Sequence, residues 1–470
     1  MRRAVLFLVV SIALAVLLFS VVRCSEPVTT QASPREPNFV YIIADDMRYD
    51  DLAYMPETRH LIGSQGLTFE NAYVPLGVCC PSRASVLTGM YTHNHKVWSN
   101  KYGPEGGWEG FRTQGHEQDN MATRMHAAGY RTGLFGKYFN FYGGSAVPAG
   151  WDDWFATSAA YFYWSANDNG VQRYYGTAQR DYQTDVLTRE TSQFIDQSIK
   201  TGKPFMAYVS PLAPHGPSTP APRHADAFDG EKAPRPPSFN EADISDKPLF
   251  AQRRSLSAAE IEAIDQTHQN RVETLQSLDD LVQAVVNKLA TKGLLSDTYV
   301  VFTSDNGWHL GEHRIPKEKG KAYEESIHVP LLIRGPGVTA GSTTEKVALN
   351  IDIFPTFADL GGLATPSYVD GRSLKPVLEG NASNWRTAFL LERRAPRDPA
   401  QSFFGIRTTE PARKYIEYEG GGRELYDLSA DPYELENTYG ATTPPQGLVS
   451  RLEALKGCAG EACRKAEDGP

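Results

Sequence analysis

Residues 79–89, Cys-Cys-Pro-Ser-Arg-Ala-Ser-Val-Leu-Thr-Gly, combine thiols, a cation and the signals of a short helix. Pro81 suits the first turn of a helix, where its missing N–H costs nothing, and Gly89 suits the C-terminal cap. Cys79 would lie at the helix N-terminus, where free N–H groups and the helix dipole favour anions. Arg83 can return to the same end. This combination predicts a reactive site, and it disfavours a Cys79–Cys80 disulfide, because adjacent cysteines rarely meet disulfide geometry.

Oxygen donors follow two apolar segments that are far apart in the sequence. Asp45 and Asp46 come directly after residues 39–44, and Asp305 and Asn306 follow residues 298–303. Each pair alone is typical of a solvated turn. Together, three carboxylates and an amide predict a site for a hard cation, calcium or magnesium rather than zinc.

Cationic and acid–base side chains complete the candidate chemistry. Lys137 follows a predicted strand, and further lysines lie at positions 317, 319 and 321. His215, in a Pro-His-Gly-Pro turn, is a candidate general acid. A metal ion, several cations and a nucleophile are what the transfer of a tetrahedral anionic group requires.

Two pairs of histidines are candidate zinc ligands. His93 with His95 and His309 with His313 have spacings that could ligate zinc, but neither pair lies near a second such pair in the sequence. We expect these histidines at the surface or at the rim of the substrate site.

The elements that must position these residues are predicted by periodicity. A continuous apolar run indicates a buried parallel strand at residues 39–44, and further strands are expected at 130–135, 205–210, 298–303 and 329–333. Helices are expected over residues 120–128 and from Ser257 to Gly293, where Ser257 and Glu260 form a capping box. The alternation predicts an α/β fold whose mainly parallel sheet is sandwiched by helices. Sites in such folds lie at the C-terminal edge of the strands, which would bring the polar residues together.

Two neighbouring regions differ from this pattern. Residues 211–248 are Pro-rich and are expected to form a long loop over the site. The aromatic segment 151–164 could stack on sugars, although packing is the commoner explanation. Beyond residue 361, short strands separated by turns predict a smaller antiparallel-sheet domain with a packed helix at residues 447–455.

The length, net charge and N-terminal segment of the chain limit the classes of protein to which it can belong. Its 470 residues suffice for two or more domains, and a net charge of −9 argues against a nucleic-acid partner. Arg2 and Arg3 precede an apolar run, so residues 1–24 are expected to be a signal peptide or an N-terminal membrane anchor, followed by a tether at 25–37. We expect an exported protein, secreted, at the cell surface or lumenal. The expected domains are a catalytic one at 38–365 and a smaller one at 366–470 with a Cys458–Cys463 disulfide.

These motifs in sequence resemble the type I sulfatases of the alkaline phosphatase superfamily. The pattern Cys79-x-Pro-Ser-Arg-x-x-x-Leu-Thr-Gly89 matches their signature over its full length. The blocks Asp45-Asp46, Gly136-Lys137, His215 and Asp305-Asn306 follow in family order, and residues 425–437 match the C-terminal block. The resemblance covers roughly residues 36–455.

The resemblance implies a mechanism and its residues. A formylglycine-generating maturation enzyme would convert Cys79, not Cys80, to formylglycine, which attacks sulfur as its hydrate. The implied calcium or magnesium ligands are Asp45, Asp46, Cys79, Asp305 and Asn306. Arg83 would hold the hydrate, Lys137 and Lys319 the sulfate, and His215 would protonate the leaving group. Lys319 is preferred to Lys321 because it lies four residues before Tyr323-Glu324.

Substrate contacts are less specified. Phe139 stands where many sulfatases have a second histidine. The resulting Gly-Lys-Tyr-x-Asn140 resembles the N-acetylglucosamine-6-sulfatase branch, so sulfated sugars or aryl sulfates are the expected substrates. Asn140, Lys321 and His309 are candidate substrate-binding residues. The alternatives are a phosphodiesterase or phosphonate monoester hydrolase on the same fold, and a non-catalytic sulfoglycan-binding protein with unmodified Cys79.

Overall fold

The computed structural model describes residues 36–143 and 146–469, and these described residues belong to one compact unit. The predicted signal peptide or anchor, at 1–24, and nearly all of the tether lie outside the described residues. Within the described ranges, no helix has the length and apolar character needed to cross a membrane.

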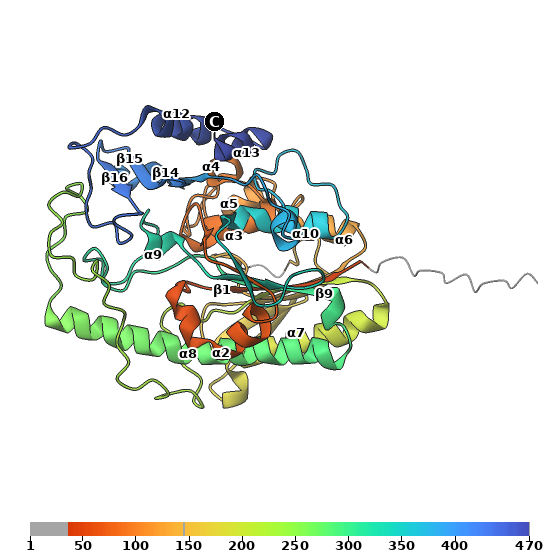
Figure 1. The fold of residues 1–470 in the computed structure, drawn as a ribbon. Helices are drawn as coiled ribbons and strands as arrows, with labels where there is room; N and C mark the ends of the chain where they lie inside the picture. Colours follow the sequence, from red (N-terminus) through yellow and green to blue (C-terminus); the bar gives the residue numbers. More distant parts are fainter. Residues whose placement is uncertain (1–35, 144–145, 470) are drawn as a thin grey trace, which may run out of the picture. The chain divides into compact units, whose positions relative to one another are not determined.

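A ten-stranded mixed sheet crosses the middle of this unit (Figure 1). Its spatial order is β11-β2-β10-β9-β1-β8-β4-β5-β6-β7. The central strands β9, β1, β8, β4 and β5 are parallel, and β10, β6 and β7 pair antiparallel. The bounds of its strands are β1 (Asn38–Ala44), β2 (Leu67–Phe69), β4 (Arg131–Gly136), β5 (Asp153–Thr157), β6 (Trp164–Asp168), β7 (Val171–Tyr175), β8 (Phe205–Ser210), β9 (Thr298–Ser304), β10 (Leu331–Arg334) and β11 (Ser342–Thr344).

Both faces of the sheet are buried, which explains why its central strands are continuously apolar. Side chains alternate between the faces of a strand. In β1, Phe39, Tyr41 and Ile43 join one hydrophobic cluster, while Val40 and Ile42 join the other. The predicted fold class is confirmed.

Helices cover each face (Figure 1). α7 and the 34-residue α8 pack on one face, and α3, α6 and α10 contribute side chains to the cluster on the other. α8 begins at the Ser257 capping box, as predicted. The helices are α2 (Pro56–Thr58), α3 (Cys79–Thr88), α4 (Thr92–His95), α5 (Gly107–Thr113), α6 (Met121–Ala127), α7 (Gln183–Thr201), α8 (Ala258–Thr291), α9 (Glu324–Ile327), α10 (Ile353–Leu360), α11 (Lys375–Leu378), α12 (Gln446–Lys456) and α13 (Glu461–Asp468).

A separate antiparallel sheet forms in the C-terminal region. Its order follows the sequence, β13 (Ala388–Arg393), β14 (Phe403–Thr409), β15 (Ala412–Tyr418) and β16 (Arg423–Asp427), and α12 and α13 cover it in Figure 1. A further two-stranded pair joins β3 (Ala72–Tyr73) to β12 (Ala348–Leu349). Cys458 and Cys463 form a disulfide. Because β13 shares a hydrophobic cluster with the main sheet, the division at residue 365 stays a prediction.

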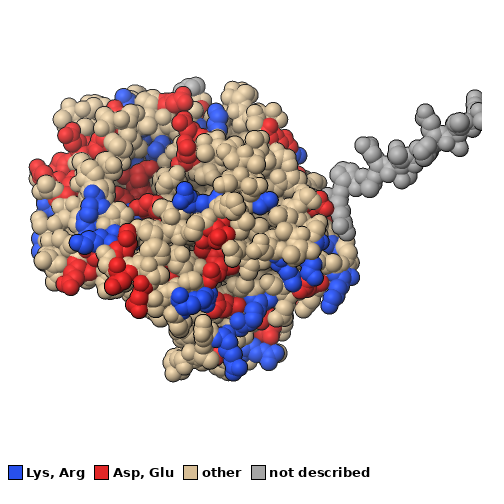
Figure 2. Space-filling model, turned by 60° about the horizontal axis from the view of Figure 1, so that its bottom comes forward, with Lys and Arg blue, Asp and Glu red and all other residues tan. Residues whose placement is uncertain are grey.

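The two unusual segments of the sequence are accounted for. Residues 211–257 form no helix or strand and make one long loop, as expected. In the aromatic segment, Trp151, Trp154 and Trp164 are buried, so packing explains most of it. On the face in Figure 2, acidic and basic side chains are interspersed.

Candidate active site

The helix that carries the cysteines is α3, which begins at Cys79, ends at Thr88 and is capped by Gly89 in the left-handed conformation. Val78 is the extended N-cap residue. The Cys79 thiol points at the carboxylates, with its Sγ 3.3 Å from Asp45 Oδ1. Cys80 instead packs in the core, and its Sγ accepts a hydrogen bond from the Asn140 N–H at 3.3 Å. One helix turn therefore presents two thiols to different environments.

The oxygen donors meet where β1 and β9 end side by side. The Asp305 N–H donates to the Ala44 carbonyl at 3.0 Å, and the Asp46 N–H donates to Asp305 Oδ1 at 3.1 Å. Asn306 Nδ2 donates to Asp46 Oδ1 at 2.7 Å. Asp46 has a φ of 68°, a region that aspartate tolerates better than most residues. The sheet thus brings together residues 260 positions apart.

Three cations surround these carboxylates. Arg83 Nε donates to Asp305 Oδ2 at 2.9 Å, Lys137 Nζ contacts Asp45 Oδ2, and Lys319 Nζ contacts Asp46 Oδ1. Lys137 follows Gly136, whose φ is 119°; a Cβ there would lie 2.0 Å from the Ser210 carbonyl oxygen. Only glycine allows β4 to deliver the lysine so close to β8.

The charges of the site are strongly coupled. Burial alone would raise the pKa of Asp45, but Lys137 and the neighbouring cations outweigh it and hold that pKa well below its usual range. Burial, together with the Asp45 charge, raises the pKa of Asp305 and of the Cys79 thiol. A thiol held protonated is a weak nucleophile.

The donor set fits a hard cation. Among the described residues, Asp46 Oδ2 and Asn306 Oδ1 are buried without a hydrogen-bond partner, although both lie in the oxygen-rich cluster. Ligand atoms of Asp45, Asp46, Cys79 and His215 all lie within 4.8 Å of one another. Oxygen donors outnumber nitrogen and sulfur donors, which favours calcium or magnesium over zinc.

His215 lies at the open side of this cluster. Its Nε2 is 3.6 Å from Asp46 Oδ2, and its side chain is 32% exposed. Its Nδ1 lies 2.7 Å from the Gly216 carbonyl oxygen, an arrangement that orients the ring. The geometry lets Nε2 exchange a proton with a group entering from solvent.

The predicted substrate-binding residues are dispersed. Asn140 is half-buried and its backbone N–H binds Cys80 Sγ. Lys321 Nζ donates to Gln401 Oε1 at 2.7 Å and pairs with Glu318 Oε1 at 3.2 Å, not with Asp45, Asp46 or Asp305. His309 was expected at the rim, but the structure buries it fully, with Nε2 3.9 Å from Glu325 Oε2. Of the four histidines expected at the surface or rim, only His93 retains partial exposure.

Two residues that support the site were not predicted from the sequence. Ser210 Oγ, at the end of β8, accepts a hydrogen bond from Arg83. Arg271, on α8, donates to the Asp46 carbonyl at 2.6 Å and pairs with Asp51 at 2.8 Å. The sequence places Arg271 on the core-facing stripe of α8, between Ile264 and Leu275. Because an unpaired buried cation is costly, an arginine at such a position indicates a buried anionic partner.

Comparison with known proteins bears on this arrangement. The family model "Sulfatase" matches residues 37–363, and the model "N-sulphoglucosamine sulphohydrolase, C-terminal" matches residues 311–455. The chain belongs to the sulfatase family. As a sulfatase it is a sulfuric ester hydrolase, which confirms the enzyme class that the sequence predicted.

Relatives of this sulfatase include N-acetylglucosamine-6-sulfatase of Capra hircus, 35% identical over 92% of this chain and 85% of the relative. The extracellular sulfatase SULF-1 homologue of Drosophila melanogaster is 36% identical over 79% of this chain, which spans only 34% of that longer protein. A protein solved in complex with its substrate D-glucosamine-2-N,6-O-disulfate superimposes with a TM-score of 0.75 at 25% identity, covering 92% of this chain and 99% of that one.

Proposed function

We propose that this sulfatase hydrolyses sulfate esters of amino sugars such as N-acetylglucosamine-6-sulfate, through a formylglycine made from Cys79 and with a bound calcium ion. The observation that carries the proposal is the position of Cys79, whose Sγ lies 3.3 Å from Asp45 Oδ1, 3.8 Å from Asp46 Oδ1 and 2.7 Å from Lys319 Nζ. Cys80, one residue further, faces the core. Maturation by a formylglycine-generating enzyme would supply an aldehyde hydrate, whose hydroxyl is the nucleophile toward sulfur.

The surrounding side chains have separable roles in this proposal. Lys137 and Lys319 bind the sulfate oxygens, since Lys319 Nζ contacts Cys79 Sγ and Lys137 Nζ contacts Asp45, the carboxylate beside that thiol. Arg83 holds Asp45 and Asp305 in place and stabilises negative charge at the hydrate. His215 Nε2 donates a proton to the leaving alkoxide, because it faces solvent on the open side of the cluster.

The proposed cation ligands are Asp45, Asp46, Asp305, Asn306 and residue 79. A bound Ca²⁺ would supply charge stabilisation for the nucleophile, and Mg²⁺ is the alternative. The buried, unpartnered oxygens Asp46 Oδ2 and Asn306 Oδ1 support this assignment among the described residues.

The substrate class rests on relatives. The proteins named N-acetylglucosamine-6-sulfatase and the complex with a disulfated glucosamine support a sulfated sugar. The extracellular relative supports export. Aryl sulfates remain in the proposed range because the chemistry at sulfur is the same.

A substrate panel combined with mass spectrometry tests the proposal. We expect sulfate release from N-acetylglucosamine-6-sulfate and from nitrophenyl sulfate, and an aldehyde at residue 79 in the tryptic peptide. Faster turnover of an aryl phosphodiester or phosphonate monoester would instead favour that activity on the same fold. An unmodified thiol at residue 79 in protein co-expressed with a maturation enzyme would contradict the mechanism.

A further inference from the structure

A cleft of about 570 Å³ lies beside the nucleophile position, between segments 98–106 and 393–401. Val78, the residue before the nucleophile, lines it. Asn100, on the same lining, accepts a hydrogen bond from the backbone N–H of Cys80 at 2.8 Å. The lining of the cleft therefore includes one neighbour of residue 79, Val78, and is hydrogen-bonded to the other, Cys80.

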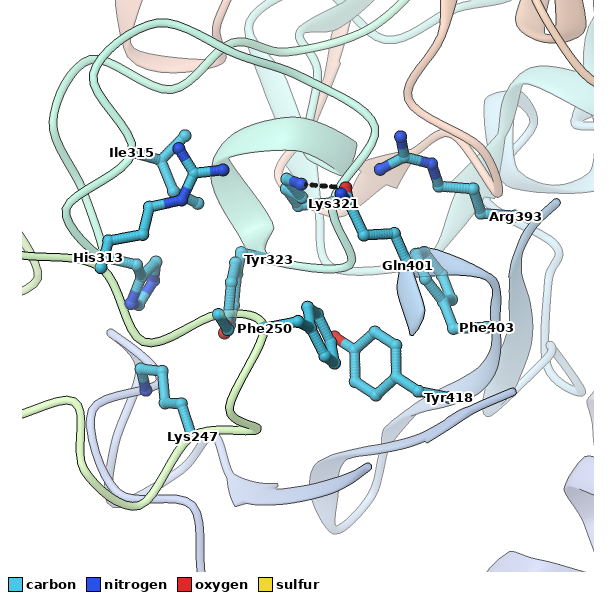
Figure 3. A pocket seen from close by; sticks show the side chains of 12 residues that line it. Lys247, Phe250, His313, Ile315, Lys321, Tyr323, Arg393, Gln401, Phe403 and Tyr418 are labelled. Carbon is cyan, nitrogen blue, oxygen red and sulfur yellow. Dashed lines mark hydrogen bonds between the residues drawn. The ribbon is translucent and has the colours of Figure 1, made fainter. Parts of the chain in front are cut away.

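The opposite wall is attached to the segment that carries the sulfate-facing lysine. Arg393 donates to the carbonyl of Gly320, which directly follows Lys319, at 2.5 Å. Lys321 donates to Gln401, and Figure 3 shows this hydrogen bond with Arg393 beside it. Arg393 and Gln401 both line the cleft, so two of its lining residues are hydrogen-bonded to the segment that directly follows Lys319.

The cleft carries an excess of positive charge. Its charged lining comprises four cations and two carboxylates: Lys101, Arg393, Arg394, Arg397, Glu105 and Asp398. Glu105 is paired with Arg394 at 3.1 Å, and Asp398 accepts from Gln401. Among the described residues, neither Lys101 nor Arg397 has a carboxylate partner within 4.0 Å. On a chain with net charge −9, these cations are a local feature rather than a general one.

An exposed aromatic ring accompanies this charge. Tyr102 lines the cleft with 71% of its surface exposed, and its ring meets Phe141 edge-on at 6.1 Å. Trp98, beneath Arg394 at 5.6 Å, is buried and supports the wall. A supported tyrosine ring offers a flat apolar surface with a polar tip, which suits the face of a pyranose.

We propose that this cleft binds the sugar adjacent to the sulfated one, through a carboxylate or a second sulfate on that sugar. This inference rests on the proposed function and deepens it: the preferred substrates are anionic oligosaccharides rather than isolated monosaccharides. Lys101 and Arg397, the lining cations without a carboxylate partner among the described residues, pair with the additional anion, and Tyr102 stacks on its ring.

The test compares kcat/KM for four probes. One is N-acetylglucosamine-6-sulfate, and three are disaccharides that link it to a uronic acid, to its carboxyl-reduced neutral counterpart, or to a sulfated neutral sugar. We expect the wild type to prefer a charged disaccharide to the neutral one by about tenfold, as for two solvent-exposed ion pairs. The uronic and sulfated probes distinguish the two sources of charge.

Variants assign the preference to the cleft. The double variant Lys101→Ala/Arg397→Ala should lose it, while its kcat/KM for the monosaccharide stays within about twofold of the wild-type value. Addition of 0.5 M salt should likewise abolish the preference in the wild type, because salt screens exposed charges. Arg397→Gln provides a milder variant if the double variant folds poorly. Arg180→Ala, at a largely exposed arginine outside the cleft, is the control.

Two outcomes overturn the inference: a charged-to-neutral ratio that persists in the double variant, or equal losses on the monosaccharide and all disaccharides. If the wild type releases sulfate from no probe, the proposed function fails separately. Calorimetric titration of the uronic disaccharide then tests whether the cleft binds the anionic sugar. Equal affinity of the wild type and the double variant for this disaccharide overturns the inference.

Discussion

Lys319 Nζ donates a hydrogen bond to Cys79 Sγ at 2.7 Å, although 240 residues separate the two in the sequence. Lys319 lies on the segment between β9 and α9, and Cys79 is the first residue of α3. The ammonium group also contacts Asp46 Oδ1. A single cation therefore links the nucleophile position to the carboxylate cluster, where it can meet the charge that develops at sulfate.

Substitution of Lys319 tests this placement. Lys319→Ala should lower kcat/KM for nitrophenyl sulfate by about 10²–10³-fold, because a preorganised charge next to the reacting group is lost. Lys203→Ala, at an exposed lysine outside the site, is the matched control. Retention of more than half of the activity in Lys319→Ala would remove the lysine from the sulfate-binding role.

The two cysteines should respond differently to the same change. Cys79→Ser should lose activity by several orders of magnitude, since serine is not a substrate for thiol oxidation to formylglycine. Cys80→Ser should keep most activity, with a modest stability loss from the core position. Kinetics and peptide mass spectrometry check both variants, and an aldehyde at residue 80 would reverse the assignment.

His215 should matter in proportion to the leaving group. A sugar alkoxide needs a proton as it departs, whereas nitrophenolate hardly does. His215→Ala should therefore lower kcat on N-acetylglucosamine-6-sulfate by about 10²–10⁴-fold and on nitrophenyl sulfate much less. Equal losses on the two substrates would indicate a positioning role, and His224→Ala serves as a control at a histidine that pairs with Asp280.

The sequence predicted β1, β4, β8, β9 and β10, the helices α3 and α8, and the small sheet, because their apolar runs and caps are local signals; β5, in the aromatic segment, was not predicted as a strand. It also predicted that Asp45, Asp305 and Lys137 would meet, since parallel strands share one C-terminal edge. β7 was missed because its residues are mostly exposed and polar. The burial of His309 was missed as well, because the contacts around it come from segments distant in sequence.

The stability of the C-terminal region should depend on the protonation of His93. Partial burial lowers the pKa of His93, but the hydrogen bond and charge of Glu392 outweigh it and raise the pKa to about 9. The folded pKa exceeds the unfolded value near 6.5, so the stabilisation is complete below about pH 6.5 and disappears as the pH rises through about 9. Glu392 contacts the His93 ring at 2.9 Å.

His93→Gln tests this dependence. Its free energy of unfolding, measured with urea under oxidising conditions, should fall below that of the wild type by up to about 3 kcal/mol at pH 6 and should approach it at pH 10. A deficit that does not change with pH would show that packing, rather than charge, accounts for the effect. His126→Gln, at a half-exposed histidine, provides the control.

The cation should stabilise the fold through the carboxylate cluster. A ligand at 100 times its Kd stabilises the native state by about 2.7 kcal/mol, so calcium should raise the melting temperature of the wild type above its value in EDTA.

Asp46→Asn removes one negative charge and the carboxylate whose Oδ2 has no hydrogen-bond partner among the described residues. In this variant the calcium-dependent rise should largely disappear, the calorimetric calcium affinity should fall by at least about tenfold, and turnover should be nearly abolished. Asp229→Asn, at an exposed aspartate, should retain the wild-type response. An unchanged calcium affinity in Asp46→Asn would show that the ion binds elsewhere, and an active enzyme in excess EDTA would remove the cation from the reaction.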